Sequence, residues 1–159
     1  MDYDFHASSS DAEQDSFCLQ GLRAEVRRGT FSTAQRKSLP ESIFHTTDFK
    51  AFQCGRVEFS EAPLPNTEKA VVAEAGDILM ARVDRSLHQK IAIVTKGRAA
   101  ITDCVYRVRL PREHQERVFN ALRSAHGERA LLSATKGVSA RLLGKAALLS
   151  LKLRDASVS

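Results

Sequence analysis

The hydrophobic period of this sequence changes at Pro111. Before it, short β-prone segments alternate with turn residues, a pattern typical of sheet. After it, apolar residues recur at the spacing of one helix face, beginning with Val118, Phe119 and Leu122. We therefore predict a helix over about 112–126. A chain that passes from strands to helices favours an α+β fold, in which a mixed twisted sheet packs against a few helices.

The turn residues divide the first part of the chain into separate strands. Gly76-Asp77 and Lys96-Gly97 are both typical of tight turns. In the last predicted strand Arg107 and Arg109 alternate with apolar residues, so we expect both arginines on its solvent side. Strands are predicted at 43–45, 56–59, 78–83, 90–94 and 104–110, and beyond the long helix we predict helical segments at 128–135 and 145–149 and a closing strand at 150–154.

Length and composition predict one domain. The chain has 159 residues, of which 43% are hydrophobic, enough for a single core. We expect this domain over 17–154, a disordered acidic tail over 1–16 and a short tail over 155–159. No apolar run approaches the roughly 18 residues that span a bilayer, and the N-terminus lacks the basic start of a secretory signal. The expected location is the cytoplasm, without membrane contact.

The charge of the chain is unevenly distributed. Residues 1–16 contain five of the 19 acidic residues and no Lys or Arg, so the other 14 acidic residues face all 24 basic ones, a net charge of +10. Lys and Arg neutralise phosphates and release counterions, so this charge suits a polyanionic partner. Many basic proteins bind no nucleic acid, however, and charge alone does not identify the partner.

The sequence contains none of the residue patterns that mark an enzyme or a metal site. Cys18, Cys54 and Cys104 are widely spaced and odd in number, which fits neither a disulfide framework nor a zinc motif. The five histidines are dispersed, with none three or four residues from another. The spacing of Gly137 and Gly144 does not match a nucleotide-phosphate loop, and no GxSxG, dinucleotide or adenine-methyltransferase motif is present. We therefore expect no catalytic activity, no cofactor and no metal.

Three stretches, taken in order, carry a family resemblance: RRGTFSTAQRK followed by FHTTDF, then VVAEAGDILMARVDR, and finally ATKGVSARLLGKAALLSLKL. Together they resemble a target-recognition domain of the DNA specificity subunits of type I restriction-modification systems, over about residues 22–153. Such subunits usually carry two recognition domains joined by long helices. No heptad run follows Leu153, so the resemblance extends to one such domain.

The resemblance implies a function. It predicts non-catalytic, sequence-specific recognition of double-stranded DNA, which would direct methyltransferase and restriction subunits in DNA methylation and phage defence. The alternative is a protein-interaction module that has kept the recognition-domain fold and no longer reads DNA. A homodimer is a further arrangement that the sequence leaves open.

Two of the stretches offer polar groups suited to DNA. RRGTFSTAQRK combines cations with short hydroxyl and amide side chains beside Gly29, and it could follow a DNA backbone or be a solvated basic loop. In FHTTDF, His45 and Thr47 could reach base edges, whereas we expect Asp48 to cap a turn. Asp77 is likewise expected to bind backbone amides rather than DNA.

The leading candidate for base readout is the connection VDRSLHQK, residues 83–90, because Gln pairs with adenine and Arg with guanine. Its alternative is a charged hairpin in solvent. The turn at 95–98 and the glycine-containing stretch at 134–145 add cations suited to phosphates. The predicted DNA-binding residues are Arg28, Thr30, Ser32, Arg36, Lys37, His45, Thr47, Arg85, His88, Gln89, Lys90, Lys96, Arg98, Lys136, Ser139 and Arg141.

Overall fold

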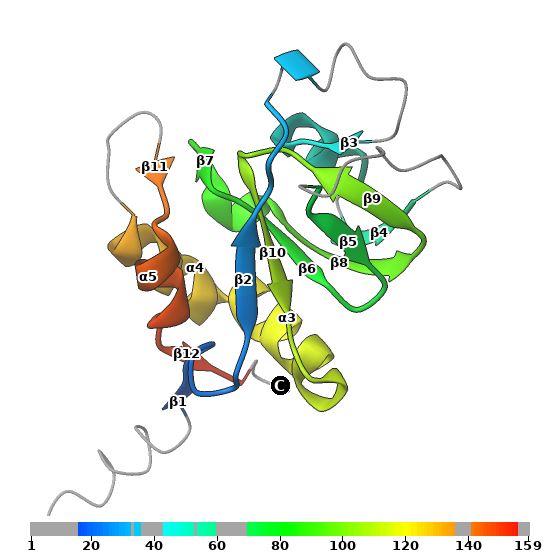
Figure 1. Ribbon diagram of the computed structural model, residues 1–159. Coiled ribbons are helices and arrows are strands. Elements are labelled where there is room, and N and C mark those ends of the chain that lie inside the picture. Colours follow the sequence, from blue (N-terminus) through cyan, green and yellow to red (C-terminus); the bar gives the residue numbers. More distant parts are fainter. Residues whose placement is uncertain are drawn as a thin grey trace, which may run out of the picture.

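The protein has the predicted α+β fold (Figure 1). The computed structural model describes residues 16–32, 34–35, 43–52, 54–59, 70–135 and 141–155. One hydrophobic core joins the main sheet to the helices, and its members extend from Leu19 to Leu153. Within the described part of the chain, no helix has the length and apolar character that crossing a bilayer requires.

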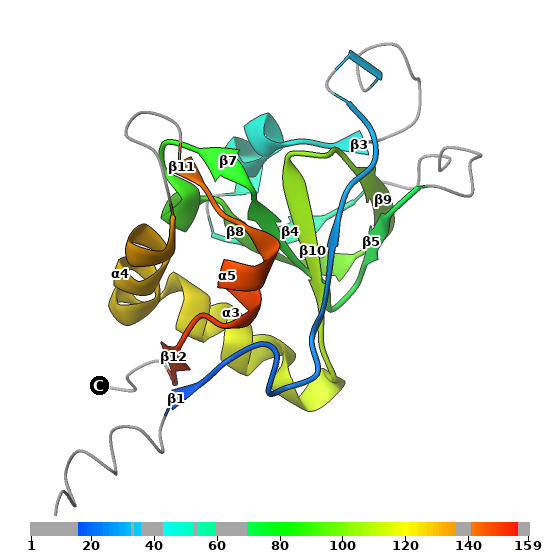
Figure 2. The ribbon, with the colours of Figure 1, turned by 60° about the vertical axis from the view of Figure 1, so that its left-hand side comes forward.

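The strands form one sheet of five, one of three and two pairs. The five-stranded sheet has the order β2-β10-β6-β8-β4, and the three-stranded sheet has the order β3-β9-β5. The two pairs are β1 with β12 and β7 with β11, and the members of each pair lie side by side in Figure 2. The strand bounds are β1 Ser16–Phe17, β2 Glu25–Arg28, β3 Ile43–Phe44, β4 Arg56–Glu58, β5 Val72–Glu74, β6 Ile78–Ala81, β7 Val83–Asp84, β8 Ile91–Lys96, β9 Arg98–Ile101, β10 Val105–Arg109, β11 Arg141–Leu142 and β12 Leu153–Arg154.

Neighbouring strands of the main sheet run antiparallel except for β4 and β8, which are parallel. The tight turns fall where predicted. Gly76 and Gly97 have φ values of +96° and +81°, in the region that favours glycine, and each links two strands. The centre of the main sheet is buried: β6 and the first four residues of β8 are apolar and buried along their whole length.

Five strands were not expected from the sequence: β1, β2, β5, β9 and β11. β2 contains three charged residues in four, and it pairs with β10 at the edge of the main sheet. β5 and β9 are short segments that pair with each other. The predicted strand at 78–83 is divided at Arg82 into β6 and β7, because β7 leaves the main sheet to pair with β11.

The prediction that both arginines of β10 face solvent is wrong for Arg107. Only 4% of Arg107 is exposed, and the carbonyl of Val72 in β5 accepts from its guanidinium at 3.0 Å. Burial lowers the pKa of Arg107, and the nearby charge of Arg109 lowers it further. Arg107 forms a salt bridge with Glu25 of the neighbouring strand β2.

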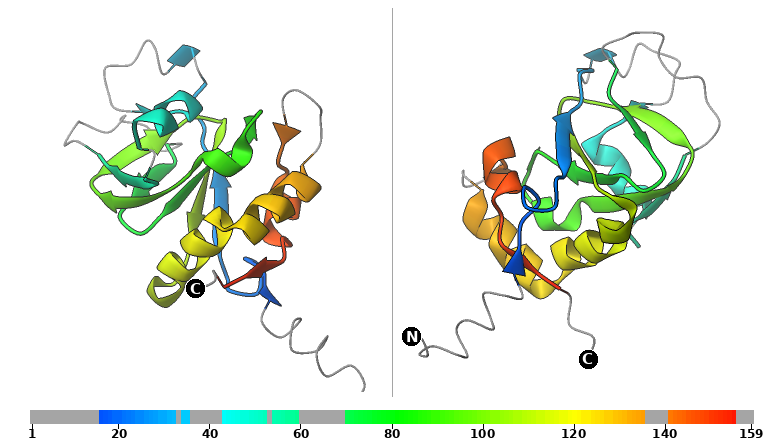
Figure 3. Two further views of the ribbon diagram at one scale, coloured as in Figure 1. Left: turned by 180° about the vertical axis from the view of Figure 1, so that it is seen from behind. Right: turned by 60° about the horizontal axis from the view of Figure 1, so that its bottom comes forward.

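The helical part is divided differently from the prediction: residues 112–114 form a 3-10 helix, and the helix expected over 128–135 begins earlier, at residue 125. The helix expected over 112–126 is divided at Ser124, which has an extended conformation and ends α3 before capping α4. The Ser124 hydroxyl accepts from the backbone N–H of Gly127 at 3.1 Å. Figure 3 shows α3 and α4 following one another along the far side of the sheet. The 3-10 helices are η1 Thr46–Phe52, η2 Leu87–Gln89 and η3 Arg112–His114, and the α-helices are α3 Gln115–Arg123, α4 Ala125–Ala134 and α5 Lys145–Leu149.

The two ends of the described chain lie together. β1 and β12 pair antiparallel, at the bottom of Figure 1. Of the predicted acidic tail only Ser16 is among the described residues, where it begins β1. At the other end, Asp155 accepts from Arg117 of α3 at 2.6 Å, and residues 156–159 lie outside the described part. The single-domain assignment over 17–154 stays a prediction.

Candidate nucleic-acid interface

One edge of the main sheet gathers several of the segments that the sequence selected. The antiparallel register places the end of β2 beside the start of β10, and the end of β6 beside the starts of both β10 and β8. The connections at these strand ends therefore meet. We call this region, which is formed by the ends of strands and not by an edge strand, the loop edge; its described residues are 28–32, 45–49, 82–90 and 102–104, near the top of Figure 1.

The turn from β9 to β10 ties the loop edge together. The carbonyl oxygen of Asp103 accepts from Arg28 Nε at 3.1 Å and from Arg82 Nε at 3.0 Å. The backbone N–H of Asp103 donates to the carbonyl of Phe31 at 2.7 Å. One turn thus holds the connection after β2 and the residue between β6 and β7. The Arg28 side chain is 52% exposed.

Gly29 permits a close approach, as the sequence suggested, and the approaching group belongs to the protein. A Cβ at this position would lie 2.0 Å from the carbonyl oxygen of Thr102. Thr30 is exposed beside it, and Ser32, which is half-buried, accepts from the backbone N–H of Gln35 at 3.1 Å. The first part of the basic stretch therefore lies on the loop edge, whereas Arg36 and Lys37 lie outside the described residues.

His45 and Thr47 have different surroundings. His45 is only 8% exposed, and its Nδ1 lies 2.7 Å from the hydroxyl of Thr102. Thr47 is exposed at the start of η1. The prediction for Asp48 is confirmed, since its Oδ2 accepts from the backbone N–H of His45 at 2.9 Å and closes the turn. In this segment Thr47 faces solvent and His45 supports the turn from within.

The prediction for Asp77 is also confirmed. Its side chain is buried and accepts from the backbone N–H of Glu74 at 2.9 Å. It also accepts two hydrogen bonds from Arg109, at 2.9 and 2.8 Å. This group stands at the edge of the sheet opposite the loop edge, so Asp77 has a structural role.

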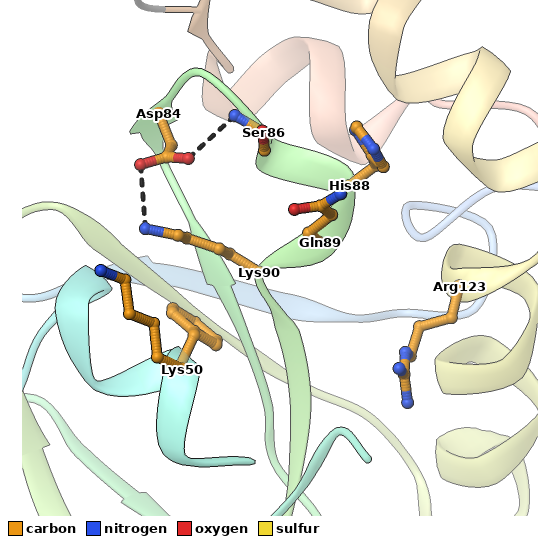
Figure 4. A pocket seen from close by; sticks show the side chains of 8 residues that line it. Lys50, Asp84, Ser86, His88, Gln89, Lys90 and Arg123 are labelled. Atoms are coloured by element: carbon orange, nitrogen blue, oxygen red, sulfur yellow. Dashed lines mark hydrogen bonds and ion pairs between the residues drawn. The ribbon is translucent and has the colours of Figure 1, made fainter. Parts of the chain in front are cut away.

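The connection at 83–90 has a defined shape. Asp84 accepts from the backbone N–H of Ser86 at 2.8 Å and from the ammonium of Lys90 at 3.0 Å (Figure 4). Partial burial by itself would raise the pKa of Asp84, but these hydrogen bonds outweigh it and hold the pKa below its usual value. Leu87 is buried and anchors η2. The connection is therefore a braced segment rather than a loose hairpin.

The candidate readout residues of this connection are not equivalent. Arg85 and Gln89 are exposed, and no hydrogen bond or ion pair engages either side chain within the described residues. Lys90 is held by Asp84 and is 17% exposed. The Nε2 of His88 lies 3.7 Å from a carboxylate oxygen of Glu128 in α4, and its Nδ1 is buried without a partner in the described part of the chain. Arg85 and Gln89 are the two members that remain available to a ligand.

The C-terminal basic stretch reaches the same edge. β11 pairs with β7, which places the backbone of Arg141 opposite Asp84, beside the 83–90 connection. Lys136 and Ser139 lie outside the described residues, as does the side chain of Arg141. The backbone pairing alone brings together two segments that are more than fifty residues apart in the sequence.

Lys96 and Arg98 are placed elsewhere. The turn that they flank joins β8 to β9 at the opposite edge of the sheet, near Gly76 and Asp77. Both residues are exposed there. The fold does not bring them together with Arg28, Arg85 or Gln89.

Sequence reasoning missed two cations beside the loop edge. Lys50 lies in η1, and Arg123 projects from α3. Together with the 83–90 connection they line one pocket. Lys50 follows the FHTTDF stretch directly and could have been added to it, but Arg123 is separated from the other segments and no local signal connects them.

The described residues contain no group of three or more His, Cys, Asp or Glu side chains that could hold a metal ion. Cys104 lies on the loop edge, where burial raises the pKa of its thiol and a hydrogen bond to Asp103 raises it further. A thiol with a raised pKa is a poor nucleophile at neutral pH. The exposed side chains Arg28, Arg85 and Gln89 give the loop edge positive charge and hydrogen-bonding groups.

No family model and no curated protein matches this sequence. Two solved structures are similar in fold. The S subunit of a type I restriction-modification system from M. genitalium superposes with a TM-score of 0.57 at 10% identity, over 87% of this chain and 33% of that chain. A chain from a structural study of complex assembly and conformational transition in the type I R-M system gives 0.58 at 15% identity, over 90% and 34%.

These likenesses concern the fold. They confirm the resemblance noted from the three sequence stretches at that level, since nearly the whole chain is covered in both superpositions. The chain spans about a third of the length of the two proteins that it matches.

Proposed function

We propose that this chain is a non-catalytic recognition domain that reads a short sequence in double-stranded DNA and directs partner methyltransferase or restriction subunits to it. The observation that carries the proposal is the loop edge. Segments selected separately from the sequence, around Arg28, Thr47, Arg85 and Gln89, meet at one end of the sheet. A fold similar to that of type I S subunits supports the same proposal.

The charges of the loop edge suit DNA. Its carboxylates are engaged within the protein: Asp48 accepts from a backbone amide, Asp84 from Lys90 and Ser86, and Asp103 lies 4.0 Å from Arg28. Arg85 carries an exposed guanidinium with no carboxylate bound to it in the described chain. A guanidinium at the tip of a braced connection can donate two parallel hydrogen bonds to guanine in the major groove.

In this proposal each part of the loop edge has its own task. Arg28 and Thr30 contact the DNA backbone and Arg85 reads a base, because backbone contacts position a protein on DNA and base contacts specify the sequence. Lys96 and Arg98 are left out, since they lie at the opposite edge. His45 is left out because it is buried. Partner chains supply any methylation or cleavage.

The test is selection of bound duplexes from a randomised DNA library near physiological salt. We expect one short motif to be enriched by the parent protein. Arg85→Ala should relax the preference at one base pair by roughly 5- to 150-fold, the range that corresponds to removing a bidentate hydrogen-bonded pair of about 1–3 kcal/mol. Arg98→Ala, the same change at the opposite edge, is the matched control and should select the parent motif unchanged.

Two results would count against the proposal. Equal relaxation by Arg85→Ala and Arg98→Ala would show that the loop edge has no special role. Absence of any duplex binding by the parent would favour the protein-interaction module, in which the same edge contacts another protein.

A further inference from the structure

A pocket opens beside the loop edge, between η1, the connection that carries η2, and α3 (Figure 4). Its volume is about 470 Å³, within the range of sites that hold small ligands. Its lining includes the amide of Gln89 and four charged side chains, those of Lys50, Asp84, Lys90 and Arg123. The sequence did not predict that these side chains lie together.

The charges in the lining are unbalanced. Three cations face one carboxylate, and that carboxylate is held by Lys90 at 3.0 Å. Like charges gathered in a concave site repel each other and raise the local concentration of anions. Lys50 is exposed, and within the described chain no carboxylate binds it. The lining therefore favours an anionic ligand.

Arg123 is fixed in position at this pocket. One of its guanidinium nitrogens donates to the carbonyl of Cys54 at 2.6 Å, and the guanidinium lies 5.4 Å from the centre of the Phe119 ring. Gly55 makes room for it, since a Cβ there would lie 2.2 Å from the same nitrogen. A cation held in this way is pre-organised, so binding an anion costs little side-chain entropy.

We infer that this pocket holds a backbone phosphate of the bound DNA, and that Gln89 serves this phosphate rather than a base edge. The inference rests on the proposed function and assigns a ligand to one part of the interface. Lysine acts as a point charge for phosphate, and an amide N–H is a common donor to phosphate oxygens. Gln89 lines the pocket with Lys50, whereas Arg85 is not part of the lining.

The first experiment measures the salt dependence of duplex affinity with the full chain. The slope of log affinity against log salt becomes shallower by about 0.9 for each phosphate that the protein no longer neutralises. We expect Lys50→Ala to reduce this slope by about that amount. Lys96→Ala removes a lysine that is also exposed but lies at the opposite edge, and it should leave the slope unchanged. Thermal unfolding of both variants checks that the fold is retained.

A second measurement distinguishes a phosphate of the DNA backbone from free inorganic phosphate as the ligand of the pocket. Inorganic phosphate is added to the protein alone, and NMR signals of residues 86–90 are followed in the parent and in Lys50→Ala. If Lys50→Ala and Lys96→Ala both bind duplex DNA with the salt slope of the parent, the inference is overturned and the proposed function stands. A Lys50-dependent shift with phosphate but no duplex binding would overturn the DNA source and the proposed function. If the parent protein responds to neither inorganic phosphate nor duplex DNA, both the inference and the proposed function are overturned.

Gln89 has its own test in the duplex selection. Gln89→Ala should weaken all duplexes by a similar factor and select the parent motif, because a hydrogen bond to phosphate carries no sequence information. Relaxed preference at an adenine would instead assign Gln89 to base readout and overturn this part of the inference.

Discussion

Two arginines on one short strand illustrate how closely residue-level electrostatics depends on neighbours. Arg107 is buried, and burial lowers its pKa. Arg109 is 39% exposed at its side chain, and two hydrogen bonds to Asp77 raise its pKa. Asp77 is the most constrained member of this group, because it also accepts from the backbone of Glu74 and is 3% exposed at its side chain. Its role in stability should exceed that of other carboxylates near Arg109.

We expect Asp77→Ala to lower the free energy of unfolding by about 2–3 kcal/mol, since it removes three hydrogen bonds and leaves a backbone N–H without its acceptor. Urea unfolding followed by circular dichroism measures the change. Glu74→Ala is the control: this glutamate contacts the same arginine at 3.6 Å but is 52% exposed, so its removal should cost less than about 1 kcal/mol. An equal loss of unfolding free energy in the two variants would contradict the structural role assigned to Asp77.

At the scale of elements, the break between α3 and α4 determines how the helices cover the sheet. Ser124 caps α4 and lets the chain change direction after Arg123. Gly127 then lies so close to the end of α3 that a Cβ would be 2.2 Å from the carbonyl oxygen of Ala121. The close approach of the two helices therefore depends on a residue that helix propensity alone would disfavour.

Gly127→Ala should consequently destabilise the protein, although the same change in an ordinary helix interior stabilises by roughly 1 kcal/mol. We expect a net loss of about 1–3 kcal/mol from the steric overlap with α3. Gly144→Ala is the matched change, because a Cβ there meets no atom within 4 Å, and it should alter stability by less than about 0.5 kcal/mol. Urea unfolding measures both variants, and a stabilised Gly127→Ala protein would show that the helices separate easily.

At the scale of the whole molecule, the core connects the beginning and the end of the described chain. Leu153 in β12 is fully buried in the same cluster as Leu19, which follows β1. The loop edge lies at the other end of the main sheet, so its polar connections are mounted on a continuous apolar core (Figure 1). This separation lets the loop edge vary in chemistry without disturbing the packing that supports it.

Leu153→Ala should therefore destabilise the entire molecule, by about 3 kcal/mol, and not merely fray its last strand. Leu142 in β11 is 43% exposed, and the same substitution there should cost less than about 1 kcal/mol. Urea titrations read by near-UV and far-UV circular dichroism measure both. Non-coincident transitions in Leu153→Ala, with the sheet intact, would contradict a core shared by both ends.

Local patterns in the sequence were enough to predict the fold class, the glycine turns at Gly76 and Gly97, the turn-capping role of Asp48 and the strands β3, β4, β6, β8, β10 and β12. Hydrophobic period and turn chemistry act over a few neighbouring residues, so they can be recognised along the chain. The burial of Arg107, the position of Lys96 and Arg98 away from the other candidates, and the meeting of Lys50 with Arg123 could not be predicted in this way. These depend on strand order and register, which bring together residues far apart in the chain. The same pairing of distant strands assembled the loop edge, and no local pattern encodes it.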